Sequence, residues 1–339
     1  MKMKKLFLSL VAAIVAATAT YAQSSMLATL SHEGNISTYY GVSALKDAYT
    51  AAANGDIITL SSGSFNAVDI AKGITIRGAG MAIDSITKTE PTIISGNFKI
   101  AIPTSVTDRL ILEGLYSNHT ITVSTNFNNG TFLKSRFKTI TYNQNMSGTK
   151  ASVSNLTMVH CKVADNISIY ANSSVSCINC FINRFGASTS SNFDFLNCVV
   201  GNNFGSYLIG FSSFKNSILI SVGSTAILPS DAVVYNCVGI NSTSKNLFTN
   251  IPNTSNIMKD YESVFKTYTG TYNDDVSFEL TDTAKTTLLG LDGTQVGMFG
   301  GNMPFDATPT NPQITKCNVA AKSTADGKLS VDITVNGAE

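Results

Sequence analysis

The sequence is poor in charged residues, and this scarcity excludes several classes of function. Only 13% of the 339 residues are Asp, Glu, Lys or Arg, and the formal net charge at neutral pH is +1. Nucleic-acid binding relies on clustered Lys and Arg, which this sequence lacks. No stretch after residue 22 approaches the roughly 20 consecutive apolar residues that a membrane-spanning helix needs. We therefore expect neither a nucleic-acid partner nor a transmembrane segment.

Residues 1–22 have the features of a secretory signal peptide. Lys2, Lys4 and Lys5 precede a short apolar run from Leu6 to Ala17, and small residues precede a cut after Ala22. We expect the mature protein to be exported to the periplasm, the cell surface or the medium. Removing these residues leaves 20 basic and 22 acidic side chains, a formal net charge of about −2.

Five pairs of residues recur at nearly constant spacing, each an Asn or His followed by a Cys or Ser. The second members lie 19, 18, 19 and 20 residues apart in the series His160-Cys161, Asn179-Cys180, Asn197-Cys198, Asn216-Ser217 and Asn236-Cys237. A period near twenty predicts a solenoid of stacked turns. Residues two and four before each pair are mostly apolar and alternate with outward residues, which predicts strands facing a core.

The asparagine is predicted to form a corner between two strands of each turn. Asparagine tolerates the left-handed conformation that a one-residue bend requires, and His160 is interpreted as its substitute in one turn. We expect the corner amides to hydrogen-bond to one another along the stack, as in other in-register ladders.

Four of the six cysteines occupy the column that follows the corner. Cys161, Cys180, Cys198 and Cys237 are predicted to point inward as free thiols that behave as small hydrophobic residues. Neighbouring turns are about 4.8 Å apart, so a disulfide of Cys180 with Cys161 or Cys198 is an alternative. Zinc is not expected, because Cys177 falls on a different inner wall from Cys180 and no second pair with histidine accompanies them.

These features resemble the right-handed parallel β-helix of the pectate-lyase-like superfamily. The resemblance covers roughly residues 40–300 and includes the glycine-rich stretch Ile57–Gly80. It implies an all-β solenoid, and after an exposed start we expect Ser43 to cap a helix that continues to about Ala53 and covers the first turn. The arrangement also resembles exported proteins of Bacteroidetes. The fold alone does not determine an activity, because one fold hosts many functions.

The C-terminal part is expected to end the solenoid and to add a small hairpin. We assign the β-helix to residues 40–303, with a last glycine-rich turn at 292–301, and a linker with a hairpin to residues 304–339. Alternating apolar residues from Leu329 to Val335 follow a turn at Asp326-Gly327. An isolated hairpin is marginal in water, so it should dock onto the β-helix or pair with something else.

Acidic residues are too few for the usual chemistry of this superfamily. Its lyases need calcium and a basic side chain, and its hydrolases need grouped carboxylates. From 105 to 245 the acids are Asp108, Glu113, Asp165, Asp194 and Asp231, and the register places Asp165 and Asp194 on different walls. The loop Asn273–Asp275 is a weak alternative for calcium, and otherwise no cofactor is expected.

One polar column provides the candidate site. Four positions after each Cys or Ser stand Asp165, Arg184, Asn202, Ser221 and Asn241. Asp165 and Arg184 are predicted to pair between adjacent turns, and with Lys162 they form the cluster that we would test for ligand binding or catalysis. The alternative is a solvated turn with a surface ion pair worth about 0–1 kcal/mol.

Apolar residues also flank the corner on the outside of the predicted solenoid. They are Phe181, Val199, Ile218 and Val238 after the Cys position, and Val159, Ile178, Leu196 and Tyr235 before the corner. Large exposed apolar patches indicate an interface. A later segment, such as residues 245–290 or the hairpin, covers this stripe, or the stripe mediates self-association or partner binding.

Two functions remain after these exclusions. The first is a non-catalytic exported β-helix protein that presents a surface for adhesion or for binding a polysaccharide or cell-surface glycan. The alternative, which the resemblance implies, is a polysaccharide lyase or another glycan-active enzyme with an unusual site.

Overall fold

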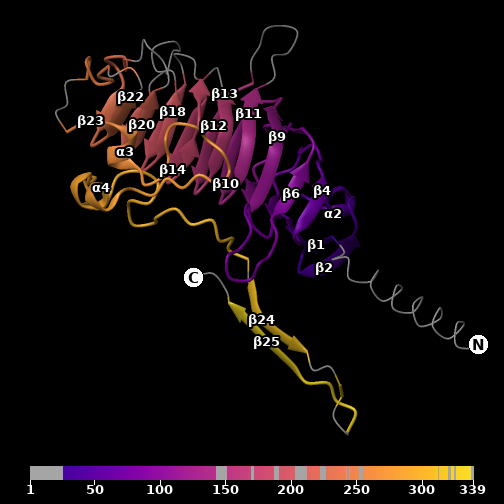
Figure 1. Cartoon of the computed structure of the whole chain (residues 1–339). Coiled ribbons are helices and arrows are strands. Elements are labelled where there is room, and N and C mark those ends of the chain that lie inside the picture. The colour runs from indigo at the N-terminus through magenta and orange to yellow at the C-terminus, as the bar shows by residue number, and fades with distance from the viewer. Residues whose placement is uncertain are drawn as a thin grey trace, which may run out of the picture.

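The computed structural model describes residues 26–142, 151–168, 172–186, 191–202, 212–221, 227–241, 243, 245–251, 255–311, 313–319, 322–323 and 326–336. The predicted signal peptide lies outside them. The chain forms a parallel β-solenoid of about eight turns, with 44% strand and 7% helix (Figure 1). The predicted fold class is therefore confirmed. Within these residues, no helix has the length and apolar character needed to cross a membrane.

Two long sheets form the walls of the solenoid. The first has the order β2-β1-β3-β5-β8-β10-β12-β14-β17-β19-β21. Its strands are β1 (Leu27–His32), β2 (Asn35–Tyr40), β3 (Ile57–Leu60), β5 (Thr75–Arg77), β8 (Leu110–Glu113), β10 (Phe127–Leu133), β12 (Val153–Val159), β14 (Ser174–Ile178), β17 (Asn192–Leu196), β19 (Ser213–Lys215) and β21 (Val233–Tyr235).

The second sheet has the order β23-β22-β20-β18-β15-β13-β11-β9-β6-β4, with β16 beside β13 and β7 beside β9. Its strands are β4 (Gly63–Asn66), β6 (Thr92–Ser95), β7 (Phe98–Ile100), β9 (Leu115–Val123), β11 (Arg136–Tyr142), β13 (Lys162–Ser168), β15 (Phe181–Ile182), β16 (Phe185–Gly186), β18 (Val199–Asn202), β20 (Ile218–Ser221), β22 (Val238–Asn241) and β23 (Ile257–Lys259).

The predicted corner joins the two sheets. The corner residues His160, Asn179, Asn197, Asn216 and Asn236 all have φ between 50° and 54°. Gly114 and Lys134, with φ of 63° and 46°, occupy the same place in the two earlier turns. The backbone continues the ladder through the corner, since Asn179 N–H donates to the Leu196 carbonyl at 3.0 Å. The left-handed bend is therefore confirmed, and it extends beyond the Asn-Cys repeat.

The five cysteines of the solenoid are free and lie in the core, as predicted. Cys161, Cys180, Cys198 and Cys237 are almost completely buried, and Cys177 is buried on the other sheet. Each corner cysteine donates its thiol to a backbone carbonyl, such as that of Leu196 for Cys198 at 3.3 Å. Neither alternative disulfide forms. Burial raises the pKa of the Cys237 thiol to about 12, so it stays protonated and uncharged.

The N-terminal end is closed by a helix and by a hairpin that the sequence did not indicate. Helix α2 (Ala44–Ala51) follows Ser43, but it ends two residues earlier than predicted because Ala52 is extended. The start of the chain is not simply exposed: β1 pairs antiparallel with β3 and with β2, and Ala28 and Leu30 are buried. This hairpin extends the first sheet beyond its first turn.

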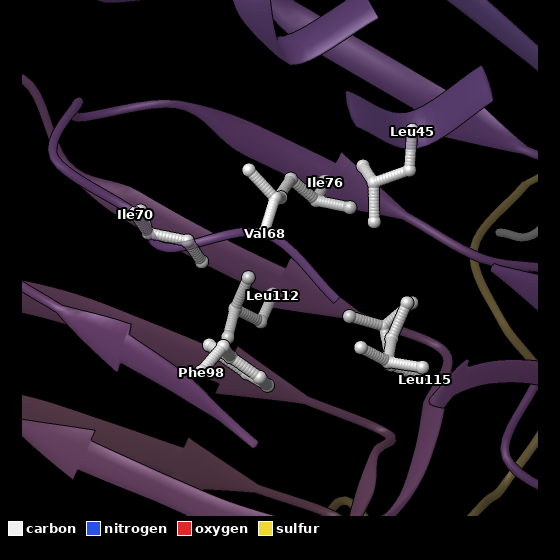
Figure 2. Close-up of a pocket in the computed structure, with 8 residues that line it drawn as sticks. Leu45, Val68, Ile70, Ile76, Phe98, Leu112 and Leu115 are labelled. Carbon is white, nitrogen blue, oxygen red and sulfur yellow. The ribbon is translucent and has the colours of Figure 1, made fainter. Parts of the chain in front are cut away.

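Beneath the helix lies a narrow space inside the solenoid (Figure 2). Its volume is only about 10 Å³, and Leu45 of α2 points into it with seven other apolar side chains: Val68, Ile70, Ile76, Ile94, Phe98, Leu112 and Leu115. A water molecule needs about this volume and also polar partners, which this lining does not provide. The space is therefore a packing void rather than a binding site.

After β23 the chain leaves the solenoid and covers part of the second sheet. This covering segment, residues 260–288, contains α3 (Tyr261–Val264) and α4 (Asp282–Thr287). Its side chains Val264, Phe265, Tyr268, Phe278 and Leu280 form a second core with Phe181, Val199, Ile218 and Val238. The apolar stripe after the corner is therefore covered, whereas Leu196 and Tyr235 before the corner remain 38% and 45% exposed.

The next residues, 289–311, form a strap that runs back along the corners (Figure 1). Asn216 accepts the N–H of Leu291 at 3.0 Å, and the Asn179 amide donates to the carbonyls of Met298 and Gly300 at 2.9 and 2.7 Å. The predicted amide ladder is therefore wrong at these two positions. The amides bind the strap because its backbone groups need partners.

The strap continues to the first turns of the solenoid. In order, His160 contacts the Met303 carbonyl, Lys134 pairs with Asp306, Glu113 accepts from Thr310, and Asn311 donates to the Gly78 carbonyl. Residues 292–301 are thus not a last turn, as the glycines suggested. Their glycines allow close approach instead, because a Cβ on Gly301 would lie 2.2 Å from the Asn197 amide nitrogen.

The predicted C-terminal hairpin is present, with a longer connection than expected. Strand β24 (Gln313–Val319) pairs antiparallel with β25 (Val331–Asn336), and Asp326-Gly327 lies in the intervening segment. Figure 1 shows the hairpin extending away from the solenoid rather than docking onto it. Val331, Ile333 and Val335 of β25 are accordingly about half exposed.

Candidate functional site

One column of outward side chains on the second sheet is polar from Tyr116 to Lys162 and apolar in the later turns of the solenoid. The column consists of the residues directly after the inward Cys position and its equivalents, and we call it the outer column. The backbone register aligns its members in the order Ile93, Tyr116, Arg136, Lys162, Phe181, Val199, Ile218 and Val238. The last four lie under the covering segment. The three polar members face a pocket.

This pocket has a volume of about 380 Å³ and takes its walls from separate parts of the chain. The lining residues are Met81, Ala82, Ile83, Pro91, Ile93, Tyr116, Arg136, Lys162, Asp274, Asp275 and Ala307. They come from the loop before β6, the outer column, the covering segment and the strap. The volume falls in the range of small-molecule sites, about 300–1,000 Å³. A mostly apolar surface with a few charged groups is also typical of such sites.

Arg136 fixes the covering segment to the solenoid. Its Nε and Nη2 donate to the two carboxylate oxygens of Asp274 at 2.8 and 3.1 Å, and Nη1 donates to the Ser117 carbonyl at 3.1 Å. The guanidinium also lies 4.7 Å from the ring centre of Tyr116. Only 8% of the side chain is exposed. Arg136 is therefore already committed to this two-pronged pair.

Asp274 is held by two tyrosines as well as by Arg136. Tyr272 and Tyr116 donate their hydroxyls to it at 2.8 and 3.0 Å. Burial alone would raise the pKa of Asp274, but these hydrogen bonds and the charge of Arg136 outweigh burial and lower that pKa. Both carboxylate oxygens of Asp274, in the loop that the sequence suggests as a weak alternative for calcium, are thus engaged. Within the described parts of the chain, no group of three metal-binding side chains occurs.

Lys162 is the cation that remains available on the pocket. Its Nζ lies 5.7 Å from the ring centre of Phe305 in the strap. The side-chain amine makes no hydrogen bond or ion pair with any residue that the structure describes. Burial lowers the pKa of Lys162, and the charge of Arg136 lowers it further, while Asp274 and Asp275 act in the opposite direction. A half-buried amine with no direct counter-charge is suited to bind or react with a ligand.

The structure separates the three residues that the sequence suggested for a site. Lys162 lines the pocket, whereas Asp165 and Arg184 do not. Asp165 and Arg184 form the predicted ion pair between turns, and Thr139 also donates to Asp165. The two side chains are 36% and 57% exposed. The prediction of a pair is confirmed, and the geometry is that of a surface ion pair.

Sequence reasoning missed Tyr116 and Arg136, and it considered Asp274 only as part of a calcium loop. Tyr116 and Arg136 precede Lys162 in the outer column, but their corners are Gly114 and Lys134, which do not match the Asn-Cys pattern. The apolar Phe137 that follows Arg136 is a local signal that Arg136 points outward. Asp274 lies 138 positions after Arg136 in the chain, and no local sequence pattern indicates that the two residues are partners.

We compared the chain with models of protein families, with curated proteins and with solved structures, and none of these comparisons gave a match. The functional interpretation below therefore depends on the geometry and charge of the pocket.

Proposed function

We propose that this protein is an exported, non-catalytic β-helix protein whose pocket binds an acidic glycan. The observation that carries the proposal is Lys162, a cation without a direct counter-charge on the wall of a 380 Å³ pocket. The carboxylate of a uronic acid would supply that counter-charge through a charge-assisted hydrogen bond. Pro91 and Ile93 offer an apolar wall for the C–H face of a sugar ring.

The geometry supports binding over catalysis. A lyase of the pectate type needs one positive group to neutralise the uronate carboxylate and a separate base to remove the neighbouring proton. The donors of Arg136 are engaged by Asp274 and by the Ser117 carbonyl. Lys162 is then the one basic side chain left on the pocket among the residues described. A single amine does not fill both roles.

The proposal is tested by calorimetric titration with a panel of uronic-acid oligosaccharides. Lys162→Ala should weaken binding at least about tenfold, which corresponds to 1.4 kcal/mol. Arg184→Ala is the matched control, because it also removes one cation from the outer surface but lies away from the pocket. Equal losses in the two variants, or no binding to any acidic oligosaccharide, would reject the proposal.

The alternative is a polysaccharide lyase in which Lys162 is the base and calcium neutralises the carboxylate. The lowered pKa of Lys162 favours this alternative. The same panel is therefore incubated with and without calcium while the ultraviolet absorbance of new double bonds is followed. A signal that disappears in Lys162→Ala and persists in Arg184→Ala would establish the lyase. The absence of both double bonds and new reducing ends leaves binding as the function.

A further inference from the structure

The surroundings of Lys162 suit covalent chemistry that the proposed glycan binding does not require. Its neighbours in the outer column are Arg136 in the turn before and Phe181 in the turn after. Phe305 of the strap lies across the amine. One neighbour is a cation and two are aromatic rings, so none of the three stabilises the ammonium form by an ion pair. A lysine that is desolvated, or that lies beside another cation, is activated as a nucleophile.

We propose that Lys162 is a nucleophilic amine that forms a reversible imine with a small aldehyde bound in the pocket. The chemical class is an aldehyde that fits about 380 Å³, such as the open-chain form of a monosaccharide. This inference does not depend on the acidic-glycan proposal, since it uses the uncharged amine, whereas the glycan proposal uses the ammonium ion.

The reaction is balanced without any redox partner. The lone pair of Nζ adds to the carbonyl carbon, and a proton moves from nitrogen to the carbonyl oxygen to give a carbinolamine. Loss of that hydroxyl with a proton, as water, leaves the C=N bond, and hydrolysis reverses the sequence. The apolar groups around the pocket, including Ile93, Pro91 and Phe305, limit water near the imine.

The charged groups facing Lys162 set the fraction of free amine. Arg136 and burial lower the pKa of Lys162, whereas the carboxylates of Asp274 and Asp275 raise it. Asp274 and Arg136 form an ion pair, and their opposite charges act on the pKa of Lys162 in opposite directions. Tyr116 donates its hydroxyl to the Asp274 carboxylate. Asp275 is therefore the negative group that can be removed without disturbing the arginine pair.

Reductive trapping of the full-length mature protein tests the proposal. The protein is incubated with glyceraldehyde and cyanoborohydride at pH 7 to low conversion, and the modification of each lysine is measured by peptide mass spectrometry. Lys162 should be modified several-fold faster than the exposed Lys46, because burial lowers the pKa of Lys162 and leaves more of it as free amine at pH 7. The rate at Lys162 should also level off at a pH below the ordinary lysine range.

Two variants make the result decisive. Asp275→Asn should increase the trapping rate at Lys162 and leave the rate at Lys46 unchanged, because it removes a charge that favours the ammonium form of Lys162. Lys162→Arg should abolish trapping in the pocket, because arginine forms no such imine, while keeping a positive charge for an acidic glycan. Trapping therefore tests the imine proposal, and binding of acidic oligosaccharides tests the glycan proposal. Trapping at Lys162 that is no faster than at Lys46, or insensitive to Asp275→Asn, would overturn the inference.

Discussion

The outer column divides into two halves with the same backbone and different surroundings. From Phe181 to Val238 its apolar side chains are buried by the covering segment. From Tyr116 to Lys162 its polar side chains border a pocket. The strands align at each outer-column position in both halves, so at these positions the difference lies in the side chains. A solenoid can therefore specify where it is covered and where it is open by changing one residue per turn.

The boundary between the two halves is made by aromatic and ionic contacts of the same loop. Tyr272 stacks on Phe181, with ring centres 4.7 Å apart, and Asp274, two residues later, pairs with Arg136. The covering segment thus makes apolar contacts with the turns from Phe181 onward and an ionic contact with the earlier turn that contains Arg136. Substitutions on either side of this boundary should have distinct consequences.

The largest effect is expected from Phe181→Ala in the apolar half. Phe181 is fully buried and stacks against Tyr272 and Phe278 with ring centres 4.7 and 4.4 Å away. Truncation of a buried Phe costs about 3–5 kcal/mol through lost contacts and a residual cavity. Urea unfolding measures this loss in the free energy of unfolding. A loss below about 1 kcal/mol would mean that the covering segment does not depend on this ring.

A smaller effect is expected where the strap meets a corner. Asn179→Gly keeps the left-handed bend but removes the two hydrogen bonds to the carbonyls of Met298 and Gly300. The expected loss of stability is about 1–3 kcal/mol. Asn236→Gly is the matched control, because Asn236 has the same φ of 50° as Asn179. Equal losses in the two variants would contradict a stabilising role for the strap.

In the polar half, Asp274→Asn should lower the free energy of unfolding of the protein by about 1–2 kcal/mol. The substitution removes the charge that pairs with Arg136, and the estimate is kept low because Asp274 is 40% exposed. Cleavage of the loop around residues 270–276 by added protease should also become faster, because its anchor is weakened. The neighbouring Asp275→Asn serves as the control and should change neither property. Identical cleavage rates in both variants would argue against the anchor.

At acidic pH, the wild-type protein should lose its higher free energy of unfolding relative to Asp274→Asn. The pKa of Asp274 is lower in the folded protein than its ordinary value, so the unfolded chain binds the proton more readily. The stabilisation is therefore fully present above about pH 4, the ordinary range for aspartate, and disappears as the pH falls through the lower folded pKa. Urea unfolding of both proteins at several pH values measures it. A difference that does not begin to decrease as the pH falls below about 4 would contradict the pairing.

The smallest effect on stability is expected on the side of the corner where Leu196 and Tyr235 stay partly exposed. Leu196→Ser should change the free energy of unfolding by no more than about 0.5 kcal/mol, because the side chain is already 38% exposed. Sedimentation analysis of wild type and variant tests the other prediction for this stripe, self-association. A dimer that dissociates in Leu196→Ser would show that a second copy supplies the missing cover.

The sequence predicted the repeating features and local elements such as α2 and the C-terminal hairpin, and it missed contacts between segments far apart in the chain. The Asn-Cys pattern gave the corner, the inward cysteines and the ion pair of Asp165 with Arg184, because each depends on a spacing of about one turn. Strap contacts such as that of His160 with Met303 join residues far apart in the chain. The pocket combines both kinds: Lys162 belongs to the repeat, whereas Asp274 reaches it from the covering segment. A periodic pattern carries no information about such partners.

The strap also changes how the molecule should unfold. Stacked repeats normally gain stability only from their nearest neighbours, so they can fray from one end without affecting the other. Here Asn311 bonds to the Gly78 carbonyl, 233 positions earlier, and Thr310 bonds to Glu113. A segment that follows the solenoid in the chain thus completes the first turns. We therefore expect the two ends of the solenoid to unfold together in one cooperative transition.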